Sequence, residues 1–234
     1  MKYGNISSAL DAESFNNSGH IASAFFYYGC NFRCGFCHNH RLLANVGDVI
    51  SEETLYAVLR QAKRNWVSTI VVSGGEPTID PHIESFLALL KKHAFRVKLD
   101  TNGSRPEVIE ALLRKKLIDY IAMDIKGTLE QYPLISGWHD TAKIRQSVEL
   151  VRSMREYEFR TTVVPRYHGA DEIKQIGKLL YGSRLYVLQQ FQPKLGAGCL
   201  DHGLEDEKTY GEAELLALAE TVRADFGEVK IKCR

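Results

Sequence analysis

The sequence predicts an α/β protein whose parallel strands form an open, partial (β/α)6 TIM-like barrel. Short β-branched and aromatic runs alternate with segments that repeat apolar residues at helical spacing, which is typical of βαβ units. Polar motifs follow the ends of four of these runs, at the edge where parallel sheets bind ligands. Because only six such units are found, the barrel is expected to fall short of the eight units that close one.

The expected strands are short apolar runs bounded by polar or turn-forming residues. Ile21 to Tyr28 is β-branched and aromatic, which favours a strand. Thr69 to Ser73 is continuously apolar, as expected of a strand that is buried on both faces. The later strands are expected at residues 95–99, 118–125, 159–164, 185–191 and, after a last helix, 229–231.

The expected helices carry apolar residues on one face. Ser51 is a suitable N-cap for the first, which aligns Leu55, Val58, Leu59 and Ala62 at helical spacing. Five more helices are expected around residues 83–90, 108–113, 144–151, 173–180 and 215–222. The glycine-rich, charged stretch from Leu195 to Tyr210 predicts a mobile loop. Since no linker or repeat is visible, residues 1–234 are expected to form one domain.

Composition and charge exclude several classes of function. The formal net charge is +1, so no electrostatic footprint for nucleic acid is visible. No apolar run approaches the roughly 20 residues that span a bilayer, and the N-terminus lacks the apolar segment of a signal peptide. The five cysteines favour a metal site in a reducing compartment over a disulfide framework. The protein is therefore expected in the cytoplasm, bound to neither nucleic acid nor membrane.

Three cysteines, Cys30, Cys34 and Cys37, lie within one short loop after the first expected strand. Thiolate-rich sites suit zinc or iron–sulfur clusters. A structural zinc site needs four ligands, and the candidates for the fourth are His38, His40, Cys199 and Cys233. His38 is adjacent to Cys37, too close to reach around the same metal comfortably. The alternative is a [4Fe–4S] cluster that three cysteines hold, which leaves one iron open for chemistry.

The cysteine spacing, followed by Gly74, Gly75 and Glu76 after the next strand, resembles the radical S-adenosylmethionine (SAM) superfamily. By this resemblance, Cys30, Cys34 and Cys37 hold the cluster, and its open iron chelates the methionine part of SAM. One electron from the cluster then yields a 5′-deoxyadenosyl radical that abstracts hydrogen. Phe36 matches the aromatic position near the adenine. Gly74, Gly75 and Glu76 match the motif that meets the methionyl amino group, where glycines admit close backbone approach and Glu76 accepts from the ammonium.

Longer runs resemble the activating proteins of glycyl radical enzymes, above all that of anaerobic ribonucleoside-triphosphate reductase. These runs are Cys-Asn-Phe-Arg-Cys-Gly-Phe-Cys-His-Asn at residues 30–39, Asp-Thr-Asn-Gly at 100–103, and the segments 120–126, 159–165 and 186–191. The resemblance covers about 21–193, with the last helix and strand, within 211–232, outside it. It implies an oxidoreductase that removes a hydrogen from a glycine of a partner enzyme. A flavodoxin or ferredoxin-type reductant is implied as the electron source.

Further site residues follow from the same resemblance. Asp100, Thr101 and Asp124 match a cluster that holds a monovalent cation in pyruvate formate-lyase activating enzyme. Two carboxylates close together need a counter-charge, which Lys126 supplies in the alternative of a plain ion pair. Asn102 is a candidate ribose contact, and Gln190 and Gln192 end the last barrel strand, where they either face the ligand or are ordinary edge polarity. Arg160 lies in an otherwise buried strand and either meets the SAM carboxylate or pairs with Asp124.

Some features depart from the resemblance and leave alternatives open. The segment from Asp11 to Gly19 replaces a short turn usual in the family, and Cys199 and Cys233 match no known position. Buried or incidental thiols are the default interpretation of those two cysteines. The competing hypotheses are a radical enzyme that acts on a small molecule, similar to 7-carboxy-7-deazaguanine synthase, an activase of another glycyl radical enzyme, and a zinc-stabilised binding protein.

Overall fold

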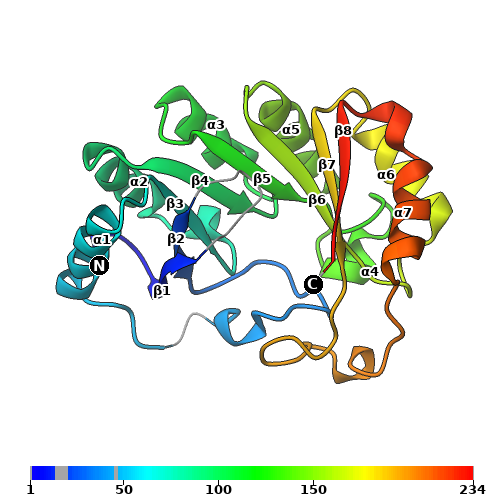
Figure 1. Cartoon of the computed structure of the whole chain (residues 1–234), viewed down its shortest axis with the longest axis horizontal. Coiled ribbons are helices and arrows are strands. Elements are labelled where there is room, and N and C mark those ends of the chain that lie inside the picture. Colours follow the sequence, from blue (N-terminus) through cyan, green and yellow to red (C-terminus); the bar gives the residue numbers. More distant parts are fainter. Residues whose placement is uncertain (1, 14–20, 45–46, 234) are drawn as a thin grey trace. The chain divides into compact units, whose positions relative to one another are not determined.

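Figure 1 shows the computed structural model of the chain, which describes residues 2–13, 21–44 and 47–233. Eight strands form one sheet in sequence order, from β1 to β8. They are β1 (Ile6–Glu13), β2 (Ala22–Tyr27), β3 (Thr69–Gly74), β4 (Arg96–Thr101), β5 (Tyr120–Asp124), β6 (Tyr157–Val163), β7 (Leu185–Gln190) and β8 (Glu228–Lys232). The α-helices are α1 (Glu52–Arg64), α2 (Ile83–Lys92), α3 (Pro106–Arg114), α4 (Tyr132–Ser136), α5 (Thr141–Arg152), α6 (Ala170–Leu179) and α7 (Glu212–Glu220).

The predicted fold class, an open α/β sheet of mostly parallel strands, is confirmed. The pairs β2–β3, β3–β4, β6–β7 and β7–β8 are all parallel. Sequence analysis missed β1, which pairs antiparallel with β2. This strand is an edge strand that exposes Ser8 and Leu10, so it lacks the apolar run that marks the inner strands. The five-residue α4 was also missed, because it is too short to show a helical period.

The described residues group into two compact units. The first comprises Met1–Asn31, Arg41–Thr101 and Glu107–Ile121, and the second comprises Phe32–His40, Asn102–Pro106 and Ala122–Arg234. The atypical N-terminal segment lies largely at 14–20, outside the described residues. The expectation of one domain over 1–234 stays a prediction.

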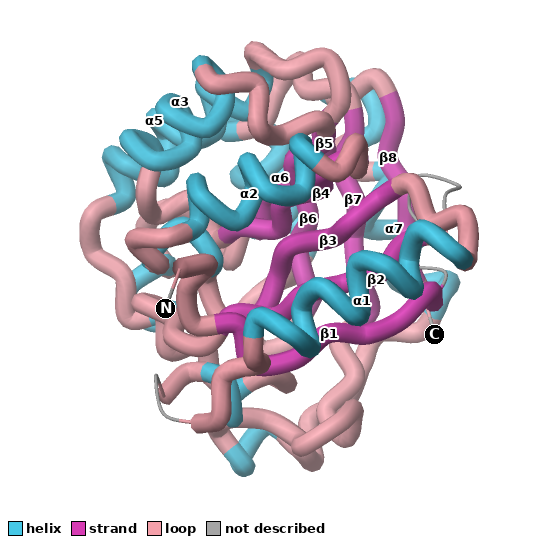
Figure 2. The backbone as a smooth tube through the Cα atoms, turned by 90° about the vertical axis from the view of Figure 1, so that its left-hand side faces the viewer, coloured by secondary structure: helices cyan, strands magenta, loops and turns pink. Residues whose placement is uncertain are grey.

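In the first unit, helices α1 and α2 lie over the strands (Figure 2). Ser51 caps α1 as predicted, because its hydroxyl accepts from the backbone N–H of Thr54 at 3.0 Å. Leu55 and Leu59 of α1 are buried, and β2 is buried along nearly its whole length. A non-glycine residue in the left-handed conformation follows each of α1, α2 and α3, namely Trp66, Ala94 and Lys116, with φ of 57°, 54° and 54°. These helices therefore end with caps that glycine would normally occupy.

In the second unit, β6, β7 and β8 lie side by side, and α6 and α7 accompany them (Figure 1). The stretch from Leu195 to Tyr210, predicted as a loop, contains only one short 3-10 helix, His202–Leu204. It packs against the loop that carries Cys34 and Cys37: the N–H of Asp201 donates to the carbonyl of Gly35 at 2.8 Å. Leu204 and Cys199 are fully buried, so the stretch is anchored at several points.

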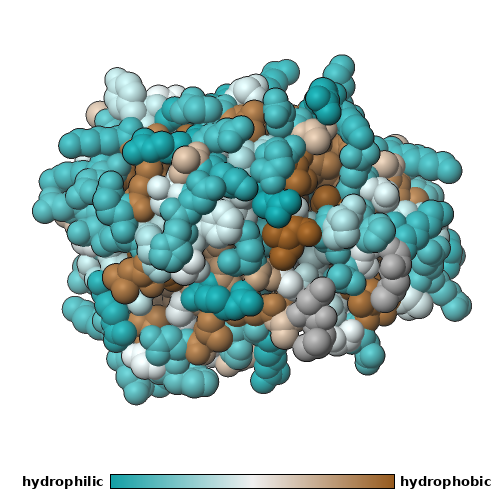
Figure 3. Space-filling model, turned by 180° about the vertical axis from the view of Figure 1, so that it is seen from behind, coloured by the Kyte–Doolittle hydropathy of each residue, from teal (hydrophilic) through white to brown (hydrophobic). Residues whose placement is uncertain are grey.

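The surface in Figure 3 carries apolar residues as small patches that hydrophilic residues separate. Within the described ranges, no helix has both the length and the apolar character needed to cross a membrane.

Candidate functional site

In the first unit, the loop that begins the cysteine motif is pressed against the glycine motif after β3. The N–H of Glu76 donates to the carbonyl of Gly29 at 2.8 Å, and the N–H of Gly75 donates to the carbonyl of Tyr27 at 2.9 Å. A Cβ on Gly75 would lie 2.0 Å from the Gly29 oxygen and 3.2 Å from Cβ of Cys30. Only glycine fits at residue 75, and this contact brings the first cysteine and the Gly-Gly-Glu motif together as the sequence predicted.

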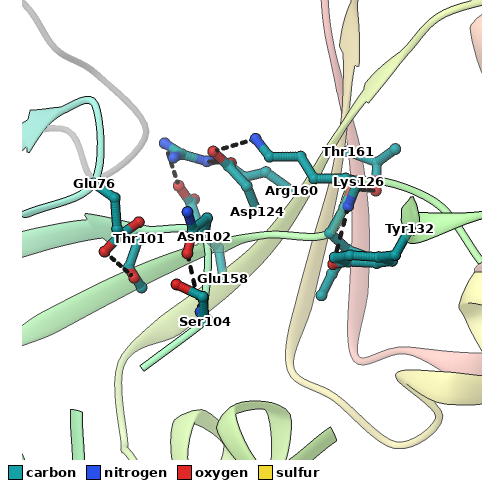
Figure 4. A network of polar contacts seen from close by, with 11 residues as sticks. Glu76, Thr101, Asn102, Ser104, Asp124, Lys126, Tyr132, Glu158, Arg160 and Thr161 are labelled. Carbon is teal, nitrogen blue, oxygen red and sulfur yellow. Dashed lines mark hydrogen bonds and ion pairs between the residues drawn. The ribbon is translucent and has the colours of Figure 1, made fainter. Parts of the chain in front are cut away.

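Glu76 is a buried carboxylate whose place is fixed by hydroxyl and amide donors. Its Oε1 accepts from the N–H of Thr78 at 3.0 Å, from the Thr78 hydroxyl at 2.5 Å and from the Thr101 hydroxyl at 2.7 Å. Figure 4 shows Glu76 and Thr101 directed toward each other. Since Thr101 ends β4 and Glu76 follows β3, the neighbouring strand ends hold this carboxylate. Three hydrogen-bond donors on one oxygen fix the position of this carboxyl group, whose oxygens are acceptors of the kind that an ammonium needs.

In the second unit, Cys34 and Cys37 lie in a tight turn, where the N–H of Cys37 donates to the carbonyl of Cys34 at 3.1 Å. Both are free thiols. Burial raises the pKa of Cys34 to about 11 and also raises that of Cys37, while the positive charge of Lys126 opposes both shifts. Such thiols stay protonated until a cation binds, and thiolates are the form that ligates metal. This donor set fits a thiolate-ligated metal centre.

Phe36 lies between the two thiols in sequence and is buried. Its ring packs edge to face on Phe191, with centroids 6.5 Å apart. The Lys126 ammonium lies 6.0 Å from the Phe36 ring centroid. The loop after β5, which carries Lys126, therefore lies beside the cysteine turn.

Asp124, at the end of β5, stands between two cations (Figure 4). Its Oδ1 accepts from Arg160 Nε at 2.9 Å, and its Oδ2 lies 3.2 Å from Lys126 Nζ. Burial opposes the charged form of Asp124, but attraction to Arg160 and Lys126 outweighs it and lowers the pKa of the carboxyl. Burial likewise opposes the ammonium of Lys126, yet Asp124 and the nearby thiols raise its pKa. The structure therefore contains two ion pairs that the sequence analysis named as alternatives, Lys126 with Asp124 and Arg160 with Asp124.

Sequence analysis missed a second carboxylate on Arg160. Glu158 is fully buried, and its Oε1 lies 3.8 Å from Arg160 Nη1. Glu158 and Arg160 are two residues apart in β6, so their side chains lie on the same face of the strand. Two opposite charges at i and i+2 in an otherwise apolar strand are therefore the sequence pattern that predicts this ion pair.

A buried network that no sequence pattern indicated holds the backbone of Lys126. The N–H of Lys126 donates to the Tyr132 hydroxyl at 3.2 Å, as Figure 4 shows, and Nε2 of His168 lies 2.9 Å from the Lys126 carbonyl. Nδ1 of His168 accepts from the N–H of Val164, which places the ring proton on Nε2. Burial lowers the pKa of His168 to about 4, so the ring is neutral.

The remaining predicted residues fall into separate places. Asp100 lies in β4 of the first unit and is half-buried. In the second unit, the Asn102 side chain accepts from the N–H of Ser104 at 2.9 Å, and the Gln190 amide donates to the carbonyl of Tyr210 at 2.9 Å. Gln192 lies two residues beyond the end of β7. Contacts of these residues with a ligand stay predictions.

Neither of the other cysteines lies in the Cys34–Cys37 turn. Cys199 is fully buried, and its Sγ donates to the carbonyl of Pro193 at 3.4 Å. Cys233 is exposed near the C-terminus. A buried thiol and an exposed one match the default interpretation of these residues.

Comparison with known proteins identifies the class to which this fold and this set of residues belong. The sequence model of the Radical SAM superfamily matches residues 25–180. The chain belongs to the radical SAM superfamily. It is 33% identical over 196 residues to a Methanocaldococcus jannaschii protein named "Putative glycyl-radical enzyme activating enzyme", covering 81% of this chain and 80% of that protein.

Solved structures with low sequence identity share the fold. Streptococcus suis SuiB bound to precursor peptide SuiA superimposes with a TM-score of 0.67 at 17% identity, covering 88% of this chain and 47% of SuiB. A domain of pyruvate-formate lyase-activating enzyme from Bacteroides vulgatus gives a TM-score of 0.50 at 16% identity, covering 70% of this chain and 98% of that domain. The superfamily implies a [4Fe–4S] cluster and SAM as cofactors.

Proposed function

We propose that this protein is an activase that uses a [4Fe–4S] cluster and SAM to remove a hydrogen atom from a glycine of a partner enzyme. The partner in this proposal is anaerobic ribonucleoside-triphosphate reductase, and the reductant is a flavodoxin or ferredoxin in the cytoplasm. The observation that carries the proposal is the likeness to a named activase over most of both chains. The motif runs quoted from the sequence favour the reductase as the partner.

Cys30, Cys34 and Cys37 are the proposed cluster ligands. The three cysteines lie within one short loop, and their spacing leaves the fourth iron without a cysteine from that loop. Burial resists ionisation of Cys34 and Cys37, so their thiolates depend on the positive charge of bound iron and of Lys126. When bound, the cluster and SAM together supply the carbon radical that abstracts hydrogen.

The polar residues of the site have the charges that SAM requires. Glu76 offers a fixed carboxylate for the methionyl ammonium, and the glycines before it allow the ligand to approach the backbone. Lys126 and Arg160 offer cations for the methionyl carboxylate, and their ion pairs with Asp124 balance their charges within a partly buried site. Phe36, Asp100, Asn102 and Gln192 complete the proposed SAM contacts.

The proposed site also includes a monovalent cation beside Asp100, Thr101 and Asp124. Because Lys126 and Arg160 already balance Asp124, the cation is expected to depend mainly on Asp100 and Thr101. Isothermal titration of SAM in potassium and in choline buffers tests it, and equal affinities in the two buffers would remove it.

The test of the activase function is electron paramagnetic resonance under anaerobic conditions. The sample contains reconstituted protein, SAM, dithionite and the anaerobic reductase from the same genome. A glycyl doublet is expected, and it should vanish with Cys34→Ala and with replacement of the target glycine. Cys233→Ala is the matched control and should leave the doublet intact, because Cys233 is exposed and outside the proposed ligand set.

Other outcomes separate the competing functions. If 5′-deoxyadenosine forms but no doublet appears with the reductase, the reductase assignment fails, and another glycyl radical enzyme or a small-molecule substrate takes its place. If protein with full iron and sulfide content forms neither, the radical function itself is wrong. Zinc at one ion per chain, without iron, would favour the binding protein.

A further inference from the structure

Tyr132, the first residue of α4, joins the loop after β5 to the segment that leads into the cysteine turn. Its hydroxyl accepts from the backbone N–H of Lys126 at 3.2 Å, and its ring packs edge to face on that of Phe32, with centroids 6.2 Å apart. Phe32 lies two residues before Cys34, and both aromatic rings are buried. Tyr132 therefore fixes Lys126 beside one of the proposed cluster ligands, and all of these residues belong to the second unit.

The backbone of Lys126 is held from its other side as well. Its carbonyl accepts from Nε2 of the neutral His168 at 2.9 Å, so both backbone polar groups of Lys126 are bonded to buried side chains. The residue before it is held in a similar way, because the Thr161 hydroxyl donates to the carbonyl of Ile125 at 2.9 Å. Side chains therefore fix this segment just beyond the point where β5 ends, and the Lys126 side chain starts from a fixed place.

The ammonium of Lys126 has one carboxylate partner and donors left for another. Its Nζ lies 3.2 Å from Oδ2 of Asp124, and its side chain is 17% exposed. Among the residues that the structure describes, Asp124 is the hydrogen-bond partner of this ammonium, which has more donors than one carboxylate oxygen uses. The ammonium also lies 6.0 Å from the Phe36 ring centroid, beside the cysteine turn. Its remaining donors suit an anionic group of a ligand held at that turn.

We propose that Tyr132 is a positioning residue for SAM: its hydroxyl sets the backbone of Lys126 so that the ammonium meets the methionyl carboxylate. This inference rests on the proposed function, in which Lys126 and Arg160 bind that carboxylate. A lysine side chain is long and flexible, and Asp124 restrains its head through one ion pair, so the place of the ammonium depends on the backbone from which the chain starts. Charge-assisted hydrogen bonds need short distances and good alignment, which a displaced lysine loses.

A structural role alone is the alternative, and Tyr157 offers a matched control for it. The Tyr157 hydroxyl also accepts from a backbone N–H, that of Arg184, at 3.0 Å. Tyr157 is buried at the start of β6 in the same unit, and neither it nor Arg184 is among the proposed SAM contacts. Replacement of either tyrosine with phenylalanine keeps the ring and removes one acceptor, so both variants should fold and lose similar stability.

The test measures SAM affinity by isothermal titration of reconstituted protein whose cluster is kept oxidised, so that no turnover occurs. The variants are matched for iron content. Tyr132→Phe should weaken SAM binding about tenfold, as expected when the partner behind a binding side chain is lost, whereas Tyr157→Phe should bind SAM as the wild type does. Lys126→Met removes the ammonium, and in that background Tyr132→Phe should cause no further loss.

Hydrogen exchange in the same samples without SAM measures the bond itself. The Lys126 amide should exchange faster in Tyr132→Phe, but at the wild-type rate in Tyr157→Phe. Wild-type SAM affinity or wild-type amide exchange of Tyr132→Phe, an equal loss of affinity in both phenylalanine variants, or the same loss in the Lys126→Met background would each overturn the proposal. If the wild type binds SAM and forms 5′-deoxyadenosine but gives no glycyl doublet, the activase assignment alone is wrong, and the SAM affinities of the variants still decide the role of Tyr132.

Discussion

Replacement of His168 with alanine should destabilise the protein strongly and in a manner that depends on pH. His168 is fully buried, and its two ring nitrogens bind the Lys126 carbonyl and the Val164 N–H. The variant leaves both backbone groups without the imidazole partner, at about 1–3 kcal/mol each. With the lost packing, the free energy of unfolding should fall by about 4 kcal/mol at pH 8.

The pH dependence follows from the lowered pKa of His168. Burial lowers this pKa from 6.5 in the unfolded chain to about 4 in the fold. The unfolded state therefore binds a proton that the folded state refuses, and the wild type loses about 3 kcal/mol as the pH falls from 7 to 4. The alanine variant has no such proton, so the difference between the two proteins should shrink to about 1 kcal/mol at pH 4.

Urea unfolding of the cluster-free protein under anaerobic conditions, followed by circular dichroism between pH 8 and pH 4, measures both effects. His139→Ala is the matched control, because His139 is exposed and its loss should change the free energy of unfolding by less than about 0.5 kcal/mol. The inferred role of His168, a buried neutral imidazole that stabilises the fold through two backbone hydrogen bonds, would be refuted by either of two results. One is a difference in free energy of unfolding between wild type and His168→Ala below about 1 kcal/mol at pH 8, and the other is a difference that stays constant with pH.

Three further predictions concern the first unit. Gly75→Ala should destabilise the protein by about 1–3 kcal/mol in urea unfolding, since its Cβ would meet the Gly29 backbone; wild-type stability would contradict this close approach. Ala94→Gly should stabilise the protein by about 0.5–1 kcal/mol in thermal unfolding, because Ala94 holds φ of 54°; a lower melting temperature would show that the alanine methyl group contributes contacts. Glu76→Gln should weaken SAM binding by about ten- to hundredfold in calorimetry, because an amide lacks the charge that an ammonium requires; unchanged affinity would remove Glu76 from the binding site.

Local sequence information was sufficient for the elements that have strong periodic patterns. The buried strand at Thr69–Gly74 and the capped helix at Glu52–Arg64 follow from apolar runs and a serine N-cap. The edge strand Ile6–Glu13 and the helix Tyr132–Ser136 were missed, because the first has no continuous apolar run and the second is shorter than two helical turns. The charged strand residue Arg160 was recognised, but its partner Glu158 was not.

The sequence by itself determined the superfamily to which this chain belongs, because cysteine spacing and the Gly-Gly-Glu motif are local properties of two short loops. Tertiary structure alone decided how the polar residues are paired. Asp124 forms ion pairs with both Lys126 and Arg160, where the sequence left open whether either pair forms. The backbone of Lys126 is held by Tyr132 and His168, which are 6 and 42 residues away in the sequence. The physical reason is that a buried charge or backbone group must find a partner wherever packing brings one within reach, and sequence separation does not limit that choice.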